Sequence, residues 1–331
     1  MLSALVVGAG RAGAGLHLPV LRGMGYGRGR AVGRPPIVVV DPGVAVAEQP
    51  GVVVAPTLAH AASLLDPART AVHLCTPPTA RLRPLTELAG LGFRHVLVEK
   101  PLATSTEELA AVLRLREAAG LDLVPVAQWR CSELTRRIAG VVAGGELGAL
   151  RSIVFTQTKP RFGRTLRGDE HPTAFDVEVP HSLAVALSIA GPARVTAAGV
   201  SDMLLGDAVF TELGGAWVRL AHRGARTEIR TDLTAPVRER RITVELEHGT
   251  LVGHYPVSAA DEYAQLLVRN RGAQSHSVFR DDSLTAFIAR AHEHFAGGRP
   301  ILDEPATGAE VVRLLDDAKR LAARVAVGAA R

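Results

Sequence analysis

A glycine triplet near the start of the chain places the tightest constraint on its fold. Gly8, Gly10 and Gly13 stand in the spacing G-x-G-x-x-G, between a β-branched run and an amphipathic stretch. The first glycine suits a tight turn, the second lets a pyrophosphate approach the backbone, and the third lets a helix pack against a strand. The N–H groups that begin such a helix bind phosphate. The context predicts a dinucleotide-binding loop, which Arg11 and Ala12 complete.

Short apolar runs alternate with helical patterns through the first part of the chain. We expect strands at residues 4–8, 37–41, 51–55, 70–76, 95–99 and 123–128. The helix expected at 104–120 opens with a capping box, Ser105 to Glu108, and closes on Gly120. Near-continuous apolar strands indicate a parallel sheet that is covered on both faces. We therefore predict an α/β Rossmann domain over residues 1–128.

The pattern changes after residue 128. Alternating polar and apolar strands then dominate, with helices expected at about 180–190, 282–296 and 306–327. This mixture predicts a second domain of the α+β class over residues 129–331. A chain of 331 residues with 47% hydrophobic content can bury the cores of two domains.

Charge and composition exclude several classes of protein. The net charge is +5, but cations and anions are interspersed, so we expect no nucleic-acid partner. No segment reaches the roughly 18 apolar residues of a membrane span. The first residues read as a strand rather than a signal peptide. Cys75 and Cys131 lack a CxxC spacing, which indicates reduced thiols, a cytoplasmic protein and no metal site.

An acidic residue, Asp41, ends the second expected strand. A carboxylate there accepts hydrogen bonds from ribose hydroxyls and repels a 2′-phosphate, so we predict NAD(H) over NADP(H). Asp41 lies 28 residues after Gly13, and a Gly/Arg-rich loop at 23–36 accounts for the long spacing. Alternatively, Asp41 only starts a turn before Pro42. The loop itself reads as a surface loop, or as a source of arginines for a cofactor phosphate.

Lysine is rare in this chain. Of the 38 basic residues, three are lysines, at positions 100, 159 and 319. Lys100 stands between Glu99 and Pro101, at the end of an apolar run. A lysine offers a compact ammonium that a forked guanidinium cannot replace. Lys319, within a charged helical pattern, reads as a surface residue.

Several segments together resemble one known family. They are "GAGRAGAGLHLPVLR" at 8–22, the segment at 74–109 that contains "VEKPLA", "GELGALRSIVF" at 145–155, and the helical stretch at 286–322. The chain resembles the glucose-fructose oxidoreductase/inositol dehydrogenase family (Gfo/Idh/MocA). The resemblance implies a Rossmann domain followed by a domain with a large open, mainly antiparallel sheet. Members often associate through that sheet, so a homodimer or homotetramer is implied.

The resemblance also implies roles for residues of the first domain. Thr76 and Pro77 would line the path of the cofactor. Glu99 would lie near the nicotinamide ribose, and Lys100 would reach the reacting oxygen. It further suggests a cis bond before Pro101.

The second catalytic group is altered relative to the family. The family places Asp-x-Gly-x-His at the start of a helix, and His181 matches the histidine, but Val177 stands where the acid is expected. An imidazole is the usual general acid/base at neutral pH. Glu178 is the favoured acid partner, and Asp176 remains an alternative. His181 alternatively caps the helix or lies in the core.

Further residues are candidates for contact with the cofactor or substrate. By resemblance, Gln128 would contact the cofactor and Arg130 the substrate, or both would lie on the surface. Lys159 and His171 bound a loop that would overhang the site. Arginines stand in this loop at 161, 164 and 167. They would favour an anionic substrate if they face the site; alternatively, the loop is only a basic surface loop in contact with solvent.

These features predict reversible hydride transfer between nicotinamide and a hydroxyl/carbonyl carbon of a sugar, cyclitol or related polyol. Two alternatives remain. One is a non-catalytic sensor or regulatory protein of the same fold that binds a nucleotide. The other is an enzyme that cleaves glycosides with the help of NAD.

Overall fold

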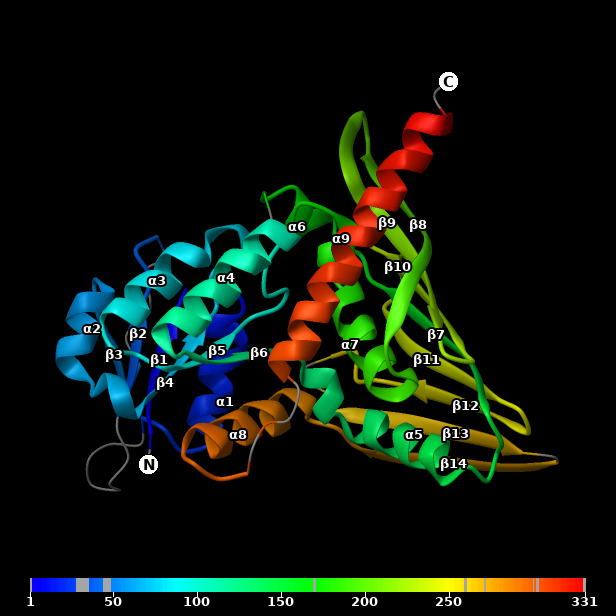
Figure 1. Cartoon of the computed structure of the whole chain (residues 1–331), viewed down its shortest axis with the longest axis horizontal. Helices are drawn as coiled ribbons and strands as arrows, with labels where there is room; N and C mark the ends of the chain where they lie inside the picture. The colour runs from blue at the N-terminus through cyan, green and yellow to red at the C-terminus, as the bar shows by residue number, and fades with distance from the viewer. Residues whose placement is uncertain are drawn as a thin grey trace. The chain divides into compact units, whose positions relative to one another are not determined.

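The computed structural model describes residues 2–27, 36–43, 49–168, 171–258, 261–270, 272–299, 301 and 304–329. They form two compact units (Figure 1). The first unit comprises Met1–Ala127 and Leu284–Val312, and the second comprises Gln128–Ser283 and Arg313–Arg331. The chain thus returns to the first unit late in the sequence. Most of the Gly/Arg-rich loop lies outside the described residues, and its role stays a prediction.

A parallel six-stranded sheet forms the centre of the first unit. Its strands are β1 (Ser3–Val7), β2 (Ile37–Val40), β3 (Val52–Val54), β4 (Thr70–Leu74), β5 (His95–Val98) and β6 (Asp122–Pro125). Their order is β3-β2-β1-β4-β5-β6, and each pair is parallel. This order is that of the Rossmann fold, in which ligands bind beyond the carboxyl ends of the strands where the order reverses.

Both faces of this sheet are buried except at the edge strand β3, where Val53 and Val54 are exposed. Burial on both faces explains the continuous apolar runs of the other strands. Leu5 and Val7 of β1 belong to one core cluster, whereas Ala4 and Val6 belong to the cluster on the opposite face. The first cluster is covered by α2 (Leu58–Leu64), α3 (Leu82–Gly90), α4 (Thr106–Ala119) and the start of α9 (Glu304–Ala329). The second is covered by a π-helical turn (Gly13–His17) that continues into α1 (Leu18–Gly23). The helix α8 (Ser283–Phe295) also belongs to this unit.

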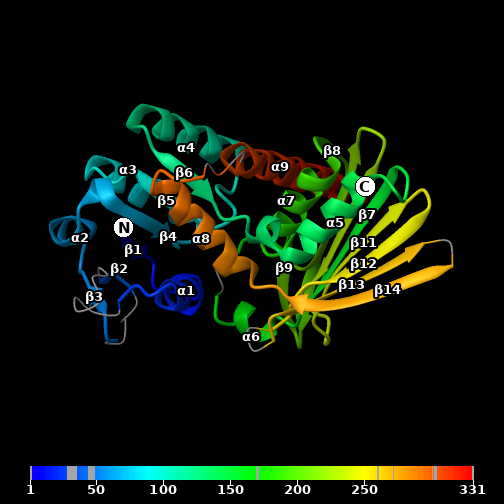
Figure 2. The same ribbon diagram turned by 90° about the horizontal axis from the view of Figure 1, so that it is seen from below.

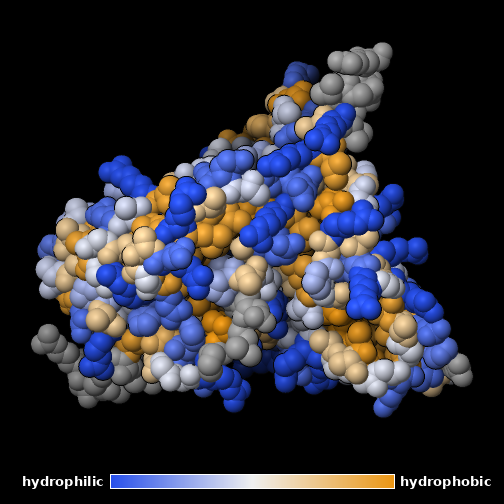
Figure 3. All heavy atoms as spheres, in the orientation of Figure 1, coloured by the Kyte–Doolittle hydropathy of each residue, from blue (hydrophilic) through white to orange (hydrophobic). Residues whose placement is uncertain are grey.

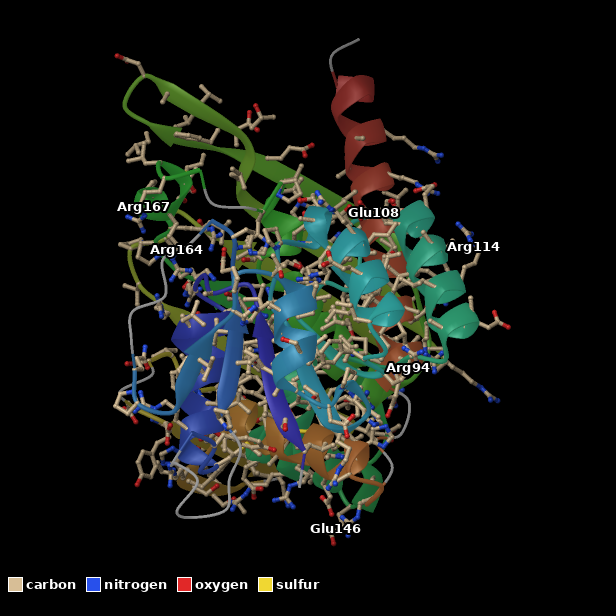
Figure 4. All side chains as sticks on the ribbon, turned by 90° about the vertical axis from the view of Figure 1, so that its left-hand side faces the viewer. Arg94, Glu108, Arg114, Glu146, Arg164 and Arg167 are labelled. Carbon is tan, nitrogen blue, oxygen red and sulfur yellow. The ribbon has the colours of Figure 1, made fainter. Side chains whose placement is uncertain are left out.

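The start of α4 has Ser105 as its N-cap, as predicted, but the return bond of the capping box is shifted by one residue. The Ser105 hydroxyl accepts a hydrogen bond from the Glu108 backbone N–H at 3.2 Å. The carboxylate of Glu108, which is labelled in Figure 4, accepts from the N–H of Thr104 at 2.9 Å, one residue before the N-cap. Gly120 caps the other end with a φ of 60°, in the left-handed region that favours glycine.

An eight-stranded sheet dominates the second unit. Its strands are β7 (Leu150–Thr158), β8 (Ala193–Leu205), β9 (Ala208–His222), β10 (Arg226–Asp232), β11 (Glu239–Leu246), β12 (Gly249–His254), β13 (Tyr263–Asn270) and β14 (Ala273–Arg280). Their order is β14-β13-β12-β11-β7-β10-β9-β8. The pair β7–β10 is parallel and the other pairs are antiparallel. The expected large, mainly antiparallel sheet is confirmed.

Two helices, α5 (Glu133–Gly144) and α7 (Val179–Ala190), pack on one face of this sheet (Figure 2). The carboxyl-terminal part of α9 belongs to the same unit. Its Lys319 donates to the buried Asp176 carboxylate at 2.7 Å, and the lysine side chain is 21% exposed. The sequence predicted only a surface position for Lys319, whereas the structure pairs its ammonium with a buried carboxylate.

Among the described residues, no helix is long and apolar enough to cross a membrane. On the face in Figure 3, hydrophilic side chains are interspersed with apolar ones.

Candidate cofactor and catalytic site

The glycine loop follows β1 at the carboxyl edge of the parallel sheet. Gly8 has a φ of +93°, and a Cβ there would lie 3.0 Å from the backbone carbon of Cys75. A Cβ on Gly13 would lie 1.8 Å from the Gly8 carbonyl oxygen. A Cβ on Gly10 would meet nothing within 4 Å. Two of the glycines are thus required by the fold itself, whereas the third faces open space in which a ligand can approach the backbone.

This contrast predicts different effects of two matched substitutions. Gly13→Ala is expected to destabilise the protein by about 3 kcal/mol, because the added methyl group overlaps backbone atoms that must move. Gly10→Ala should leave the thermal midpoint unchanged and weaken binding of NADH or NADPH by about tenfold, or about 1.4 kcal/mol. Thermal unfolding and a fluorescence titration of the cofactor measure the two effects. Equal destabilisation by both substitutions would contradict the distinction.

Asp41 connects the end of β2 to the glycine loop. One carboxylate oxygen accepts from the Ala9 N–H at 2.6 Å, and the other accepts from the Gly43 N–H at 2.8 Å. The second contact is the turn-starting role that the sequence left open. The first places the acid beside the loop in which a dinucleotide would bind, so the two interpretations of Asp41 are compatible.

The ends of β4 and β5 carry the other predicted cofactor residues. The hydroxyl oxygen of Thr76 is buried and has no hydrogen-bond partner among the described residues. Arg81, which the sequence did not single out, donates to the Thr76 carbonyl at 3.1 Å and to the Lys100 carbonyl at 3.3 Å. It also donates to the carbonyl of Pro101. Arg81 therefore ties the loop after β4 to the turn after β5.

The turn after β5 presents Glu99 and Lys100. A Glu99 carboxylate oxygen accepts from the Lys100 backbone N–H at 3.1 Å. The bond between Lys100 and Pro101 is cis, as the family resemblance suggested. The other Glu99 oxygen lies 2.9 Å from Nε2 of His17, whose side chain is fully buried.

This ion pair shifts the pKa values of both partners. Burial alone would raise the pKa of Glu99, but the hydrogen bond and charge of His17, with Lys100 and Arg81, lower it to about 2. Burial alone would lower the pKa of His17, but the interactions with Cys75 and Glu99 raise it to about 10. At neutral pH the pair is therefore a carboxylate and an imidazolium.

Neither His17 nor His73 of β4 was predicted as a site residue from the sequence. Both had a visible signal. His17 lies four residues after Gly13, on the helix that the glycine motif starts. His73 interrupts an otherwise apolar strand, where a buried polar side chain requires a partner.

The carboxyl edge of the first unit fits a dinucleotide. Gly10 leaves open space beside the loop, and the buried Thr76 hydroxyl lacks a partner in the part of the chain that the structure describes. Buried polar groups are almost always hydrogen-bonded, so this hydroxyl fits a polar ligand atom. The described residues contain no group of three or more His, Cys, Asp and Glu side chains that could hold a metal ion.

In the second unit, His181 lies in the first turn of α7. Pro180 precedes it in that turn, as the sequence predicted. The imidazole stacks on the buried Trp129 ring, with centroids 5.2 Å apart and an interplanar angle of 21°. Tyr255 also stacks on Trp129, with centroids 4.2 Å apart. This aromatic packing fixes the plane of the candidate acid/base.

Both acids near His181 are paired with lysines. Asp176 is fully buried, binds Lys319 and accepts from the Thr173 hydroxyl at 2.8 Å. Glu178 is buried and forms an ion pair with Lys159. The structure thus brings together two residues for which the sequence predicted different roles, Glu178 for catalysis and Lys159 for substrate binding.

The remaining candidates lie elsewhere in the second unit. Gln128 and Arg130 are half-buried in a 3-10 turn (Gln128–Cys131) that precedes α5. His171 is half-buried and precedes the turn Ala174–Asp176. Of the loop arginines, Arg161 is buried, whereas Arg164 and Arg167 lie on and just after the short α6 (Phe162–Thr165; Figure 4). Their contact with a substrate stays a prediction.

Comparison with known proteins agrees with the fold and the loop geometry. Residues 2–125 match the family described as "Oxidoreductase family, NAD-binding Rossmann fold" (GFO_IDH_MocA). Over these residues, the chain is similar to the Gfo/Idh/MocA oxidoreductases.

Curated relatives match this chain over limited lengths. A D-xylose 1-dehydrogenase (NADP(+)) of Haloferax volcanii is 38% identical over 111 residues, or 33% of each chain. An uncharacterized oxidoreductase of Rhizobium meliloti is 34% identical over 96 residues, or 28% of each chain. The matches thus span about a third of these relatives.

A solved structure matches over nearly the whole chain. KijD10, a 3-ketoreductase from Actinomadura kijaniata crystallised with NADP and TDP-benzene, has a TM-score of 0.79 at 14% identity, over 97% of both chains. At this identity the likeness is one of fold.

Proposed function

We propose that this protein is an oxidoreductase that transfers a hydride between a nicotinamide cofactor and a hydroxyl/carbonyl carbon of a sugar, cyclitol or related polyol. The observation that supports it most is the carboxyl edge of the parallel sheet. There the open glycine loop follows β1, and the Glu99–Lys100 turn follows β5. The Thr76 hydroxyl, which has no partner among the described residues, follows β4. The names of two similar proteins, a D-xylose 1-dehydrogenase and a 3-ketoreductase, describe reactions of the same type.

The residues would divide the work in the following way. The loop at Gly8–Gly13, Thr76 and Pro77 would hold the cofactor, whose nicotinamide supplies or accepts the hydride. Lys100 would donate a hydrogen bond to the reacting oxygen and stabilise negative charge on it. His181 would take the hydroxyl proton in oxidation and return it in reduction. Reduction or oxidation of a panel of sugars and cyclitols, followed at 340 nm, tests the proposal; turnover with none of them would contradict it.

We further propose that NAD(H) is preferred over NADP(H), because the Asp41 carboxylate would repel a 2′-phosphate. The relative from Haloferax volcanii and the KijD10 structure carry NADP in their names, so this preference needs a direct test. Asp41→Asn removes the charge and keeps an oxygen that can accept from the Ala9 N–H. The ratio of the KM for NADPH to that for NADH is expected to fall at least tenfold. A wild-type protein that already prefers NADPH would contradict the proposal.

The lysine partners of Asp176 and Glu178 favour a second candidate, a sensor that binds the dinucleotide without turnover. In that case NADH would bind, sugars would shift the thermal midpoint, and no product would form. Mass spectrometry of the reaction mixture distinguishes this outcome from slow turnover. We also propose a cytoplasmic homodimer or homotetramer, associated through the eight-stranded sheet; sedimentation tests its size.

A further inference from the structure

A continuous row of buried side chains extends from Glu99 through the interior of the first unit. It runs from the Glu99 carboxylate through His17, His73 and His292 to the phenol of Tyr26; we call it the histidine relay. The Nδ1 atoms of His17 and His73 are 2.7 Å apart, and the Nε2 atoms of His73 and His292 are 2.8 Å apart. At one end, His17 Nε2 lies 2.9 Å from a carboxylate oxygen of Glu99. At the other end, His292 Nδ1 lies 2.9 Å from the hydroxyl oxygen of Tyr26. Nothing in the proposed mechanism uses this row beyond Glu99.

The relay is not a metal site. A metal between two imidazoles stands about 2.0–2.1 Å from each nitrogen, which sets the nitrogens well over 3 Å apart. The observed separations of 2.7 and 2.8 Å leave room for one hydrogen only. The row is therefore held together by shared protons.

Shared protons couple the links to one another. A neutral imidazole donates from one nitrogen and accepts at the other. With three neutral rings, every link must point toward Glu99, starting from the Tyr26 hydroxyl. One added proton makes His17 an imidazolium that donates to both Glu99 and His73. His73 must then donate to His292, and His292 to Tyr26, so a single proton reverses each link beyond His17.

Neighbouring groups favour the state with the added proton on His17, although burial opposes it. Burial opposes the cation, but Cys75 and Glu99 outweigh it and raise the pKa of His17 to about 10. Burial lowers the pKa of His73, and the charges of His17 and His292 lower it further. Burial and the charge of His17 lower the pKa of His292 to about 4. One cation therefore occupies the row at neutral pH, next to Glu99.

The position of this proton matters for Lys100. Glu99 accepts a hydrogen bond from the Lys100 backbone, and the Lys100 and Arg81 charges act on its carboxylate. Without a cation on His17, the Glu99 charge would be left for the Lys100 ammonium to neutralise. With the cation present, the Glu99 carboxylate is neutralised by His17, on the side that faces the protein interior.

We propose that the histidine relay holds one proton on His17 that neutralises Glu99 from the interior side, so that the Glu99 charge competes less with the substrate oxygen for the Lys100 ammonium. His73, His292 and Tyr26 are then positioning residues that fix this proton at a distance from the reacting atoms. The part that concerns Lys100 rests on the proposed function. The proton order itself does not, and it can be measured without turnover.

Two substitutions at His73 separate the proton order from the fold. His73→Leu suits the apolar strand β4 but removes the acceptor for the His17 Nδ1–H. His73→Gln restores an acceptor oxygen. In full-length protein labelled with 15N-histidine, NMR is expected to show both His17 nitrogens protonated at pH 8 in the wild type and in His73→Gln. In His73→Leu, His17 should lose its second proton at least one pH unit lower than in the wild type.

Tyr26→Phe tests whether the links act together. It removes only the terminal hydroxyl, yet it should change the tautomer signals of His73 as well as those of His292. Tyr255→Phe is the matched control, because it removes a buried phenol that is bonded at 2.8 Å to Thr135 in the second unit. It should leave the three histidines unchanged. An unaltered His17 titration in His73→Leu, or unaltered His73 signals in Tyr26→Phe, would overturn the proposal.

Kinetics then separate the relay from the proposed function. If the protein turns over a polyol, the alkaline limb of kcat should shift to lower pH in His73→Leu and return in His73→Gln, with the KM for the cofactor unchanged. An unmoved limb would overturn the link to Lys100. If the NMR results hold and no polyol is turned over, the proposed function fails while the proton order on His17 stands.

Discussion

Lys100→Ala is expected to lower turnover by about 10²–10³ while NADH still binds with its wild-type affinity. The ammonium would stabilise the oxygen as negative charge develops on it, and removal of one such donor costs rates of this order. The cofactor loop is independent of this side chain, since it is built from Gly8, Gly13 and Asp41. Steady-state kinetics and a fluorescence titration of NADH measure the two quantities on one preparation.

Lys100→Met is the control for the loss of volume, because it keeps the stem and removes only the charge. It should be as slow as Lys100→Ala. His181→Ala should also lower kcat by orders of magnitude, as expected for a general acid/base. Near-normal turnover in both Lys100→Ala and His181→Ala would show that the catalytic assignment is wrong.

Glu99→Gln is expected to lower the free energy of unfolding by about 3–5 kcal/mol at pH 7. Removal of one partner from a buried ion pair leaves the other charge uncompensated, and here the remaining charge is the imidazolium of His17. Urea unfolding measures the change. Asp122→Asn is a suitable comparison, because that half-exposed carboxylate contacts His95 and His294 in the same unit and should cost far less.

The same pair gives stability a defined dependence on pH. His17 has a raised pKa of about 10 against an ordinary 6.5, so its contribution is complete below pH 6.5 and is lost as pH rises toward 10. Glu99 has a lowered pKa of about 2 against 4.5, so its contribution is complete above pH 4.5 and is lost toward pH 2. The pKa of His292 is lowered to about 4 from an ordinary 6.5. Its contribution to stability is therefore complete above pH 6.5 and is lost as the pH falls toward 4.

These three contributions place the stability maximum near pH 6.5. On the alkaline side, each proton released on unfolding changes the free energy by about 1.4 kcal/mol per pH unit. The alkaline decline should be shallower in Glu99→Gln, because one of the interactions that raise the pKa of His17 is gone. Unfolding curves at intervals between pH 4 and 10 test this, and a constant stability from pH 6.5 to 10 would contradict a folded-state imidazolium at His17.

The parallel sheet and the glycine loop could be predicted from the sequence because their signals are local. The G-x-G-x-x-G spacing, the capping box at Ser105 and Glu108, and the apolar strands each lie within one short segment. Lys100 also had a local signal, since lysine is rare in a chain rich in arginine. The position of the cofactor site at the carboxyl edge of the sheet then follows from the topology, because all parallel strands end at the same edge.

The partners of the charged residues could not be predicted, because they come from distant segments. Asp176 binds Lys319, which lies 143 positions away, and the His73 ring meets His292, which lies 219 positions away. No spacing rule links such positions. The sequence therefore offered Asp176 and Glu178 as partners of His181, whereas the structure gives each of them a lysine partner.

The late return of the chain to the first unit has a consequence for its synthesis. His292 completes the relay, and Ala309 and Val312 complete a core cluster, yet all three leave the ribosome after the second sheet. Domains that are continuous in sequence can fold as soon as they emerge. Here we expect the Rossmann unit to remain unfinished until Val312 has been translated. Protease protection of stalled nascent chains should therefore appear after residue 312 rather than after residue 127.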